Sequence, residues 1–307
     1  MPESGVMIEF LVGVDGGGTA TRALLADRDG AVLGRGVAGP SGLAHGTATA
    51  WREVRLAIVR AFDSAGLRYP DDWSRCALGA GLAGSNHAPW RDAFIAQNIG
   101  FGQLAVDTDG FTMLLGAHAG RAGVVVAAGT GSVAEVLRAD GSRGSVGGWG
   151  FPVGDEGSGA WLGLRAVRIA QAAIDGRAPS GALARKVWAV CGAERDTLLA
   201  WCAQAGQFAY AQLAPIVFDT EACDPAAAHL LARAVAELEA MAHALDPCGE
   251  LPLAVSGSVA RRLAPRLEPA LRARRVEPAD GPDSGALALI RRAVAAASAT
   301  PTSTSTT

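Results

Sequence analysis

A glycine-rich turn beside an acidic residue is the first feature of this sequence that can perform chemistry. The run Asp15-Gly16-Gly17-Gly18-Thr19 follows an apolar stretch. Glycines let backbone N–H groups approach an anion closely, so this turn suits a phosphate. Because a carboxylate beside a phosphate needs a cation between them, we expect Asp15 to hold Mg²⁺ on a nucleotide and Thr19 to add a hydroxyl. The alternative is a plain hairpin in which Asp15 caps the turn.

Two later glycine turns can extend the same nucleotide site. Gly129-Thr130-Gly131-Ser132 also follows an apolar run and predicts a second phosphate cradle, so that two opposed hairpins would grip one polyphosphate. Gly257-Ser258 follows a late apolar run and opens a helix. Because N–H groups at a helix N-terminus attract anions, this end suits a contact with adenosine or its α-phosphate.

Acidic residues at two further places can act on a substrate. In Asp107-Thr108-Asp109 one carboxylate could serve as a general base and the other, or Thr108, as a helix cap; alternatively both carboxylates are caps. The run from Gly147 to Gly159 is very rich in glycine and costs backbone entropy to order, which favours a ligand-binding loop. Within it, the acids Asp155 and Glu156 suit hydrogen bonds to polyol hydroxyls, and Trp149 could pack on a sugar or adenine face.

The elements that must position these residues occur as a repeated pattern. Strands are expected over 8–14, 19–26 and 31–37, and again over 124–128 and 133–138, with hairpin signals at Asp29-Gly30 and Asp140-Gly141. This repeat predicts two similar α/β halves; the alternative is an ordinary α/β protein with several strands that end in glycine. Further strands are expected over 77–82, 104–106 and 251–255, and helices over 48–62, 160–175, 180–191, 194–206, 224–245, 259–273 and 283–297.

Composition excludes several classes of protein. The length of 307 residues, 50% of them hydrophobic, favours two globular domains. The net charge of -3 argues against a general nucleic-acid binder. Lys186 is the single lysine, so a lysine-containing phosphate loop is absent. The five scattered cysteines fit neither a disulfide framework, a zinc ribbon nor an iron–sulfur cluster. With no basic leader and no long apolar run, we expect a cytoplasmic protein without a membrane partner, and a disordered tail over 299–307.

The order of the motifs resembles a known superfamily. The turns at 15–19, 129–132 and 257–259 resemble the phosphate-1, phosphate-2 and adenosine motifs of the actin-like sugar kinases. The run 147–159 resembles the N-acetylglucosamine-kinase branch, which shares a family with the BadF/BadG-type ATPases. Ala205-Gly206-Gln207-Phe208 and Pro282-Asp283-Ser284-Gly285-Ala286-Leu287 are similar to segments of bacterial glucosamine kinases in that branch.

The resemblance, which runs from about Val12 to Ile290, implies a fold and an activity. The fold would be two actin-like (ribonuclease H-like) lobes with a cleft between them: residues 1–115 joined by a C-terminal helix over 283–298, and residues 116–282. The activity would be the ATP-dependent phosphorylation of the 6-hydroxyl of an amino sugar, glucosamine before N-acetylglucosamine, with Mg²⁺ as cofactor. The helical second half could form the face of a homodimer.

The same resemblance implies a role for each motif. Asp109 would be the base, Asp15 would organise Mg²⁺, and the glycine turns would stabilise phosphate charge. Asp155, with Gly131 and Glu156 nearby, would hold the sugar. The loop Pro40-Ser41-Gly42 would also bind it, although Gly42 stands where the family usually has an asparagine and Thr108 replaces an asparagine before the base.

Two other functions fit parts of this pattern. One is an ATPase of the BadF/BadG type that acts on a protein partner; the iron–sulfur cysteines of the reductase-activating members are missing here. The other is a sugar-responsive regulator without catalysis, against which the presence of Asp15 and Asp109 argues.

Overall fold

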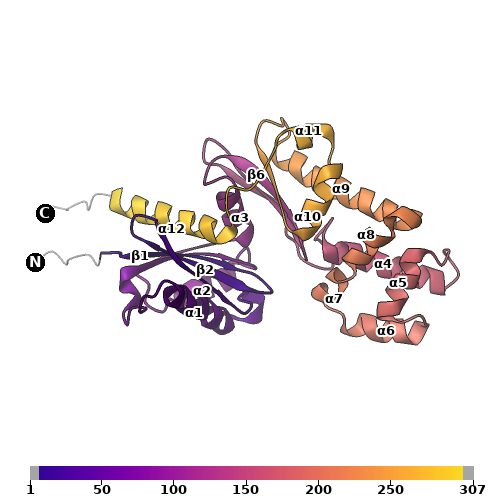
Figure 1. The fold of residues 1–307 in the computed structure, drawn as a ribbon, viewed down its shortest axis with the longest axis horizontal. Helices are drawn as coiled ribbons and strands as arrows, with labels where there is room; N and C mark the ends of the chain where they lie inside the picture. Colours follow the sequence, from indigo (N-terminus) through magenta and orange to yellow (C-terminus); the bar gives the residue numbers. More distant parts are fainter. Residues whose placement is uncertain (1–6, 300–307) are drawn as a thin grey trace, which may run out of the picture. The chain divides into compact units, whose positions relative to one another are not determined.

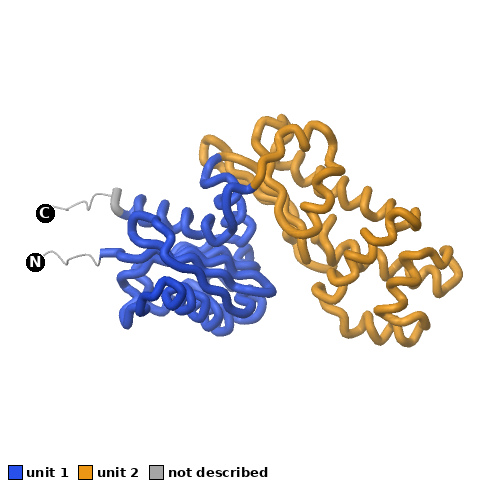
Figure 2. The backbone as a smooth tube through the Cα atoms, viewed as in Figure 1, with its two compact units in different colours: residues 1–121, 278–307 blue, residues 122–277 orange. Residues whose placement is uncertain are grey.

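The chain forms two compact units, each built on one five-stranded sheet. The computed structural model describes residues 7–299, and its units comprise residues 1–121 with 278–307, and residues 122–277 (Figure 2). The chain therefore passes from unit 1 to unit 2 and returns, so that the last helix belongs with the first sheet (Figure 1).

The sheet of unit 1 has the strand order β3-β2-β1-β4-β5. Strands β1 and β2 and strands β2 and β3 pair antiparallel, whereas β1 pairs with β4, and β4 with β5, in parallel. The carboxyl ends of β1, β4 and β5 therefore lie at one edge. The five strands are β1 (Phe10–Gly16), β2 (Thr21–Asp27), β3 (Val32–Ala38), β4 (Cys76–Leu82) and β5 (Gln103–Asp107).

The sheet of unit 2 repeats this topology strand for strand. Its order β8-β7-β6-β9-β10 has the same two antiparallel pairs followed by two parallel pairs. The predicted duplication is thus confirmed at the level of strand order and direction. The strands are β6 (Gly123–Ala128), β7 (Ser132–Leu137), β8 (Arg143–Gly147), β9 (Leu253–Ser256) and β10 (Arg275–Val276).

Helices cover both faces of the first sheet, and glycines let them approach closely. Helix α1 (Thr47–Ser64) packs on β3 and β2, and α12 (Pro282–Ala299) packs on β1, β4 and the helix α3 (Asp109–Ala117). A Cβ on Gly13 would lie 2.2 Å from the Asp283 carbonyl oxygen, and one on Gly79 would lie 2.1 Å from that of Ala286. These paired glycines place the first turn of α12 against β1 and β4. The short helix α2 (Ala88–Ala96) packs against α1.

The second sheet carries a larger helical layer. The core of unit 2 includes a cluster of buried side chains from β6, β7, β9 and most of the helices of that layer. The helices are α4 (Gly159–Ile174), α5 (Ala182–Cys191), α6 (Arg195–Gln204), α7 (Gln207–Ala211), α8 (Ala214–Thr220), α9 (Pro225–Leu245), α10 (Ser258–Leu263) and α11 (Pro269–Ala273).

One predicted helix is wrong. The helix expected over 259–273 is divided into α10, a 3₁₀ turn at Ala264–Arg266 and α11. The cause is Pro265 and Pro269, because proline removes a backbone donor and clashes with the preceding turn. The structure also adds α7 and α8, which lie between two predicted helices.

The C-terminal helix is present, and the predicted tail lies beyond the residues that the structure describes. The helix expected over 283–297 is α12, and the tail expected over 299–307 falls outside the described residues from residue 300 onward. Among residues 7–299, none of the helices has the length and apolar character needed to cross a membrane.

Candidate functional site

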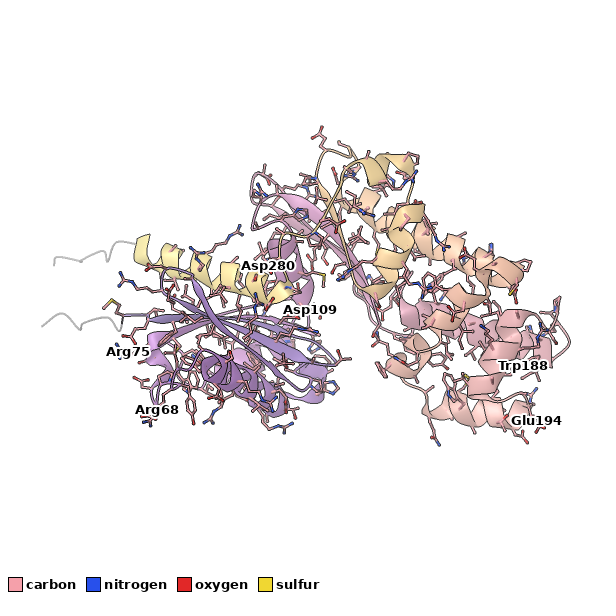
Figure 3. All side chains as sticks on the ribbon, viewed as in Figure 1. Arg68, Arg75, Asp109, Trp188, Glu194 and Asp280 are labelled. Atoms are coloured by element: carbon pink, nitrogen blue, oxygen red, sulfur yellow. The ribbon has the colours of Figure 1, made fainter. Side chains whose placement is uncertain are left out.

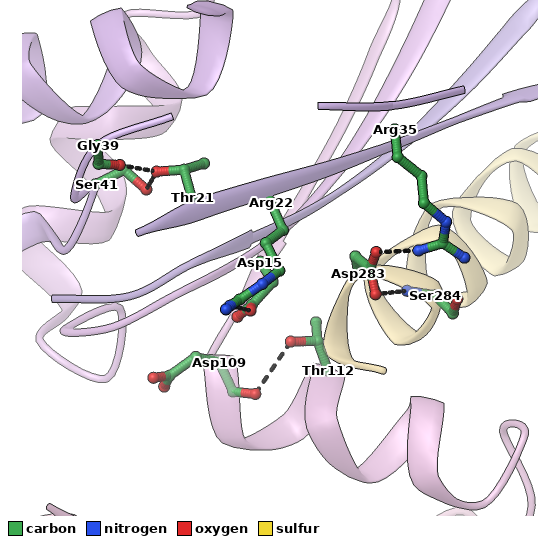
Figure 4. A network of polar contacts seen from close by, with 10 residues as sticks. All are labelled: Asp15, Thr21, Arg22, Arg35, Gly39, Ser41, Asp109, Thr112, Asp283 and Ser284. Carbon is green, nitrogen blue, oxygen red and sulfur yellow. Dashed lines mark hydrogen bonds and ion pairs between the residues drawn. The ribbon is translucent and has the colours of Figure 1, made fainter. Parts of the chain in front are cut away.

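The carboxyl edge of the first sheet brings Asp15 and its neighbours into one row. Asp15 on β1 is in register with Arg22 on β2 and Gly81 on β4, and Gly81 is in register with Asp107 on β5. Residues opposite one another on neighbouring strands project from the same face. Arg22 Nη1 lies 3.4 Å from Asp15 Oδ2 (Figure 4). The predicted metal ligand is therefore paired with a half-exposed arginine.

Gly81 allows α3 to pack against this row. A Cβ at Gly81 would lie only 1.9 Å from Thr112 Oγ1, so any side chain there would push α3 away. Asp109 is three residues before Thr112 and lies at the start of α3 (Figure 3). Because residues three apart share a helix face, the close packing at Gly81 carries Asp109 toward Asp15 (Figure 4).

The electrostatics of Asp15 reflect this crowding. Its pKa is raised to about 6, first by burial and then by the negative charge of Asp109, with Asp283 adding a smaller effect in the same direction. Arg22 lowers the pKa but does not cancel the rise. A divalent cation would relieve the repulsion between these carboxylates, so the arrangement fits a cation site.

Asp109 and Asp107 have different surroundings. Thr108 caps α3, its Oγ1 accepting a hydrogen bond from the Phe111 N–H at 3.0 Å, and Asp107 Oδ1 accepts one from the Thr108 N–H at 2.8 Å. Burial raises the pKa of the Asp109 carboxyl, and the N–H of Gly110, which donates to it, lowers the pKa by less. Thr108 is thus the cap, and Asp109 is the carboxyl whose proton affinity is raised.

The first glycine turn is hydrogen-bonded to the loop Pro40-Ser41-Gly42. The Gly17 N–H donates to the Ala20 carbonyl, and the Gly17 carbonyl accepts hydrogen bonds from the N–H groups of Ser41 and Gly42 at 3.1 and 3.0 Å. The Ser41 side chain is fully buried, and its hydroxyl lies 2.7 Å from that of Thr21 (Figure 4). The structure thus places Ser41 and Gly42 beside the turn that was predicted to hold phosphate.

The second glycine turn is held by the start of α4. The Gly129 carbonyl accepts a hydrogen bond from the Gly159 N–H at 2.8 Å, and the Thr130 carbonyl accepts one from Ala160 at 3.1 Å. In unit 1 the Gly42 N–H donates to the Gly17 carbonyl in the same way as the Gly159 N–H donates to the Gly129 carbonyl. The two glycine turns are therefore braced in the same way.

Asp155 lies against the second turn. Its Oδ1 accepts a hydrogen bond from the Ser132 N–H at 3.2 Å, and its Oδ2 accepts one from Gln207 Nε2 at 2.7 Å. A Cβ on Gly131 would lie 2.7 Å from Oδ1, so only glycine admits the carboxylate here. Asp155 is 4% exposed, and burial raises its pKa, although the Ser132 N–H opposes the rise.

The loop that contains Asp155 has an unusual backbone, and its residues differ in exposure. Asp155 has the positive φ of 62°, which an L-residue seldom adopts and which commonly accompanies a functional site. The Glu156 carbonyl accepts a hydrogen bond from Ser132 Oγ at 2.7 Å, so this loop is tied twice to the second turn. Trp149, predicted to stack on a ring, is 84% exposed and free to meet a ligand from solvent.

Gly257 completes the set of unit 2. It lies between β9 and α10 with a φ of 88°, and a Cβ there would lie 2.3 Å from the carbonyl oxygen of Ala128, the residue before the second turn. Gly257 and Ser258 therefore begin α10 directly beside the predicted phosphate cradle.

Two residues that contact these sites had no role predicted from the sequence. Gln207, on α7, binds Asp155, and Asp283, in the first turn of α12, accepts a hydrogen bond of 2.8 Å from Arg35 Nη1 (Figure 4). Both lie in segments that resemble glucosamine kinases, which was the available signal for them. Of the predicted site residues, Asp15 to Thr19, Ser41, Gly42 and Asp109 lie in unit 1, and those from Gly129 to Ser258 lie in unit 2.

A metal ion at Asp15 would need ligands from outside the protein. Within residues 7–299, no group of three or more His, Cys, Asp and Glu side chains could hold a metal ion. A cation at Asp15 would therefore take its other ligands from phosphate and water. Mg²⁺ is commonly bound in this way, through one or two carboxylates and the substrate's phosphates.

Comparison with known proteins decides the family. A model of the BadF/BadG/BcrA/BcrD ATPase family matches residues 12–274. This chain belongs to that family. Solved structures that share this fold include a ROK hexokinase from Thermus thermophilus, which is 19% identical with a TM-score of 0.50 and covers 93% of this chain and 99% of its own.

Individual relatives of this family member are kinases by name. Glucosamine kinase GspK of Vibrio cholerae is 34% identical over 281 residues, which cover 91% of this chain and 95% of that protein. The N-acetylmuramic acid/N-acetylglucosamine kinase of Clostridium acetobutylicum is 28% identical over 55% of this chain and 56% of its own. A solved structure from Chromobacterium violaceum, named as a candidate N-acetylglucosamine kinase, is 43% identical with a TM-score of 0.88, covering 92% of this chain and 99% of its own.

Proposed function

We propose that this protein is an ATP-dependent kinase that transfers the γ-phosphoryl group to the 6-hydroxyl of an amino sugar, glucosamine before N-acetylglucosamine. The observation that carries the proposal is Asp109, a partly buried carboxyl at the start of α3 whose pKa burial raises. The names of the relatives from Vibrio cholerae and Clostridium acetobutylicum support an amino sugar as the acceptor.

In the proposed reaction Asp109 acts as the base. Its carboxylate accepts the proton of the sugar 6-hydroxyl while the hydroxyl oxygen attacks the γ-phosphorus in line. The new P–O bond forms, the bond to the β-phosphate oxygen breaks, and ADP leaves with that electron pair. A raised pKa makes the carboxylate a better proton acceptor near neutral pH.

The glycine turns and Asp15 serve the phosphates. The turn at Gly16, Gly17 and Gly18 would bind phosphate through the Gly18 N–H and the Thr19 hydroxyl, because the Gly17 N–H already donates to the Ala20 carbonyl. The turn at 129–132 would also bind phosphate. Gly257 and Ser258 would contact the adenosine side. Mg²⁺, held at Asp15, would neutralise phosphate charge when it is bound.

The sugar would be held chiefly by Asp155. A buried carboxylate with two fixed donors is rigid, and its remaining lone pairs can accept hydrogen bonds from hydroxyls. Glu156 and Gly131 lie beside it. We also assign Ser41 and Gly42 to the sugar, Ser41 through its backbone carbonyl because its side chain is fully buried and its N–H donates to Gly17.

An ADP-release assay over a panel of sugars tests this function. We expect turnover that depends on glucosamine and, more weakly, on N-acetylglucosamine, and a product phosphorylated at the 6-position by ³¹P and ¹H NMR. Turnover that needs no sugar and rises with a protein partner would instead establish the alternative ATPase activity. Absence of turnover on both amino sugars overturns the proposal.

The proposal also includes the setting of the enzyme. Its partners would be the amino sugar and ATP, without nucleic acid or membrane, its location the cytoplasm, and its assembly a homodimer. Sedimentation of the purified protein at micromolar concentration would distinguish a dimer from a monomer.

A further inference from the structure

Gln207 joins a separate helix to the acid and the glycine turn of unit 2. It is the first residue of α7. Its Nε2 donates to Asp155 Oδ2 at 2.7 Å, and a Cβ on Gly131 would lie 3.1 Å from the same nitrogen. Three segments that are distant in the sequence therefore meet at one point, where Gln207 is partly exposed.

The contact with Asp155 fixes which way the amide faces. An ionised carboxylate only accepts hydrogen bonds, so the amide must turn its NH₂ group toward Asp155. The carbonyl oxygen Oε1 then points elsewhere. It accepts no hydrogen bond from residues 7–299, and it is not among the buried side-chain atoms that lack a partner. Gln207 thus offers an open acceptor beside the carboxylate.

Two acidic residues lie in the segment that Gln207 contacts, and Arg165 lies within electrostatic range of one of them, Glu156. Asp155 and Glu156 are consecutive, and the charge of Glu156 contributes to raising the pKa of Asp155. The donors nearest to Asp155, the Ser132 N–H and Gln207 Nε2, are already used by its two oxygens. The remaining lone pairs of Asp155 and the Gln207 carbonyl oxygen are therefore acceptors for a ligand. Such a set favours a group that donates several hydrogen bonds and carries positive charge.

We propose that Gln207 is a specificity-determining residue whose Oε1 accepts a hydrogen bond from the 2-amino group of the sugar, beside Asp155. This assignment rests on the proposed function. A protonated amine has three N–H donors and suits an all-acceptor site, whereas a 2-hydroxyl has one donor and an acetamide has one N–H and a bulky acyl group. Gln207 therefore selects the free amine.

The experiment compares glucosamine with glucose, which has a hydroxyl in place of the amine. For the wild type we expect kcat/KM to favour glucosamine at least tenfold, since a hydrogen bond with a charged partner is worth about that factor or more. Gln207→Met keeps the approximate length but removes donor and acceptor. We expect it to reduce the glucosamine-to-glucose ratio of kcat/KM about tenfold, and Gln212→Met, an exposed position just after α7, to leave the ratio unchanged.

The possible outcomes separate this role from others. If Gln207→Met slows both sugars by the same factor, Gln207 only positions Asp155 and the assignment is wrong. Equal kcat/KM for the two sugars in the wild type also overturns it, and this measurement does not depend on the folding of a variant. If the wild type phosphorylates no sugar at all, the proposed function fails and the assignment fails with it.

Discussion

The Ser132 N–H donates a hydrogen bond of 3.2 Å to Oδ1 of Asp155, so the residue that ends the second glycine turn also fixes the acid of the following loop. Ser132 Oγ in addition donates to the Glu156 carbonyl at 2.7 Å. A displacement of the turn therefore displaces the acids as well. If the turn binds phosphate and Asp155 binds sugar, one small element aligns donor and acceptor substrates.

Gly131→Ala tests this alignment. The added Cβ would lie 2.7 Å from Asp155 Oδ1, closer than real Cβ contacts come, so the carboxylate must move. We expect the KM for the sugar to rise about tenfold or more, because Asp155 would lose its fixed geometry. Steady-state kinetics with the sugar varied at saturating ATP measures this.

A matched control for that variant lies at the start of α7. Gly206 has no heavy atom within 4 Å of the position of a Cβ, and its φ of -88° suits alanine. Gly206→Ala should change the KM for the sugar less than twofold. An unchanged KM in Gly131→Ala would show that Asp155 does not hold the sugar.

Asp109 and Asp107 provide a comparison within one short segment. Removal of a general base costs about 10²- to 10⁴-fold in rate, so Asp109→Asn should lower kcat within that range while the Kd for ATP changes little. Asp107 accepts the Thr108 N–H instead, so Asp107→Asn should lower kcat less than tenfold. Rapid-quench kinetics and nucleotide titration measure the two effects. Equal losses in both variants would remove Asp109 as the base.

Gly42 is open to a side chain, which makes its replacement informative. A Cβ there would lie 3.6 Å from the Gly17 carbonyl oxygen and 3.7 Å from the Ala83 Cβ, both ordinary contacts, and the φ of -55° suits any residue. Gly42→Asn should therefore keep the wild-type melting temperature within about 2 °C. Because the resemblance to sugar kinases implies a sugar-binding asparagine at this position, we expect Gly42→Asn to lower the KM for the sugar. Gly42→Ala is the control, and an equal effect of the two variants would contradict an amide contact.

The duplicated fold was predictable because its signals are local. Each half has an apolar run, a glycine turn, a second strand and a DG hairpin within about 30 residues, and strand order then follows from the pairing. The helix expected over 259–273 is wrong because Pro265 and Pro269 interrupt it. The strand expected over 8–14 is Phe10–Gly16 in the structure, since pairing with β4 continues through Asp15.

The missed site residues depend on contacts between distant segments. Gln207 is 52 residues from Asp155, and Asp283 is 248 residues from Arg35. A single sequence contains no local pattern that pairs such residues. Asp109 could be proposed from its segment, but its elevated pKa arises from burial, which depends on how α3 packs over Gly81.

Asp15 connects function with stability. Its pKa is about 6 in the folded protein against 3.8 for an ordinary aspartate, so the folded state binds the proton more tightly than the unfolded state does. Stability therefore falls as pH rises from about 4 to about 6 and stays lower above that range. The difference corresponds to about 3 kcal/mol above pH 7, which is an upper limit for what removal of the charge can restore.

Asp15→Asn should consequently stabilise the protein in the absence of nucleotide and metal while it weakens Mg²⁺-dependent binding of ATP. We expect a gain in the free energy of unfolding of about 1–3 kcal/mol at pH 8 and a smaller gain at pH 5, where the folded wild type is mostly protonated at Asp15. Urea denaturation in EDTA at both pH values measures it. Asp71→Asn, whose side chain is 85% exposed, is the control and should change stability by less than about 0.5 kcal/mol. A gain that is equal at pH 5 and pH 8 would show that the charge of Asp15 is not its source, because only a titrating group makes the difference depend on pH.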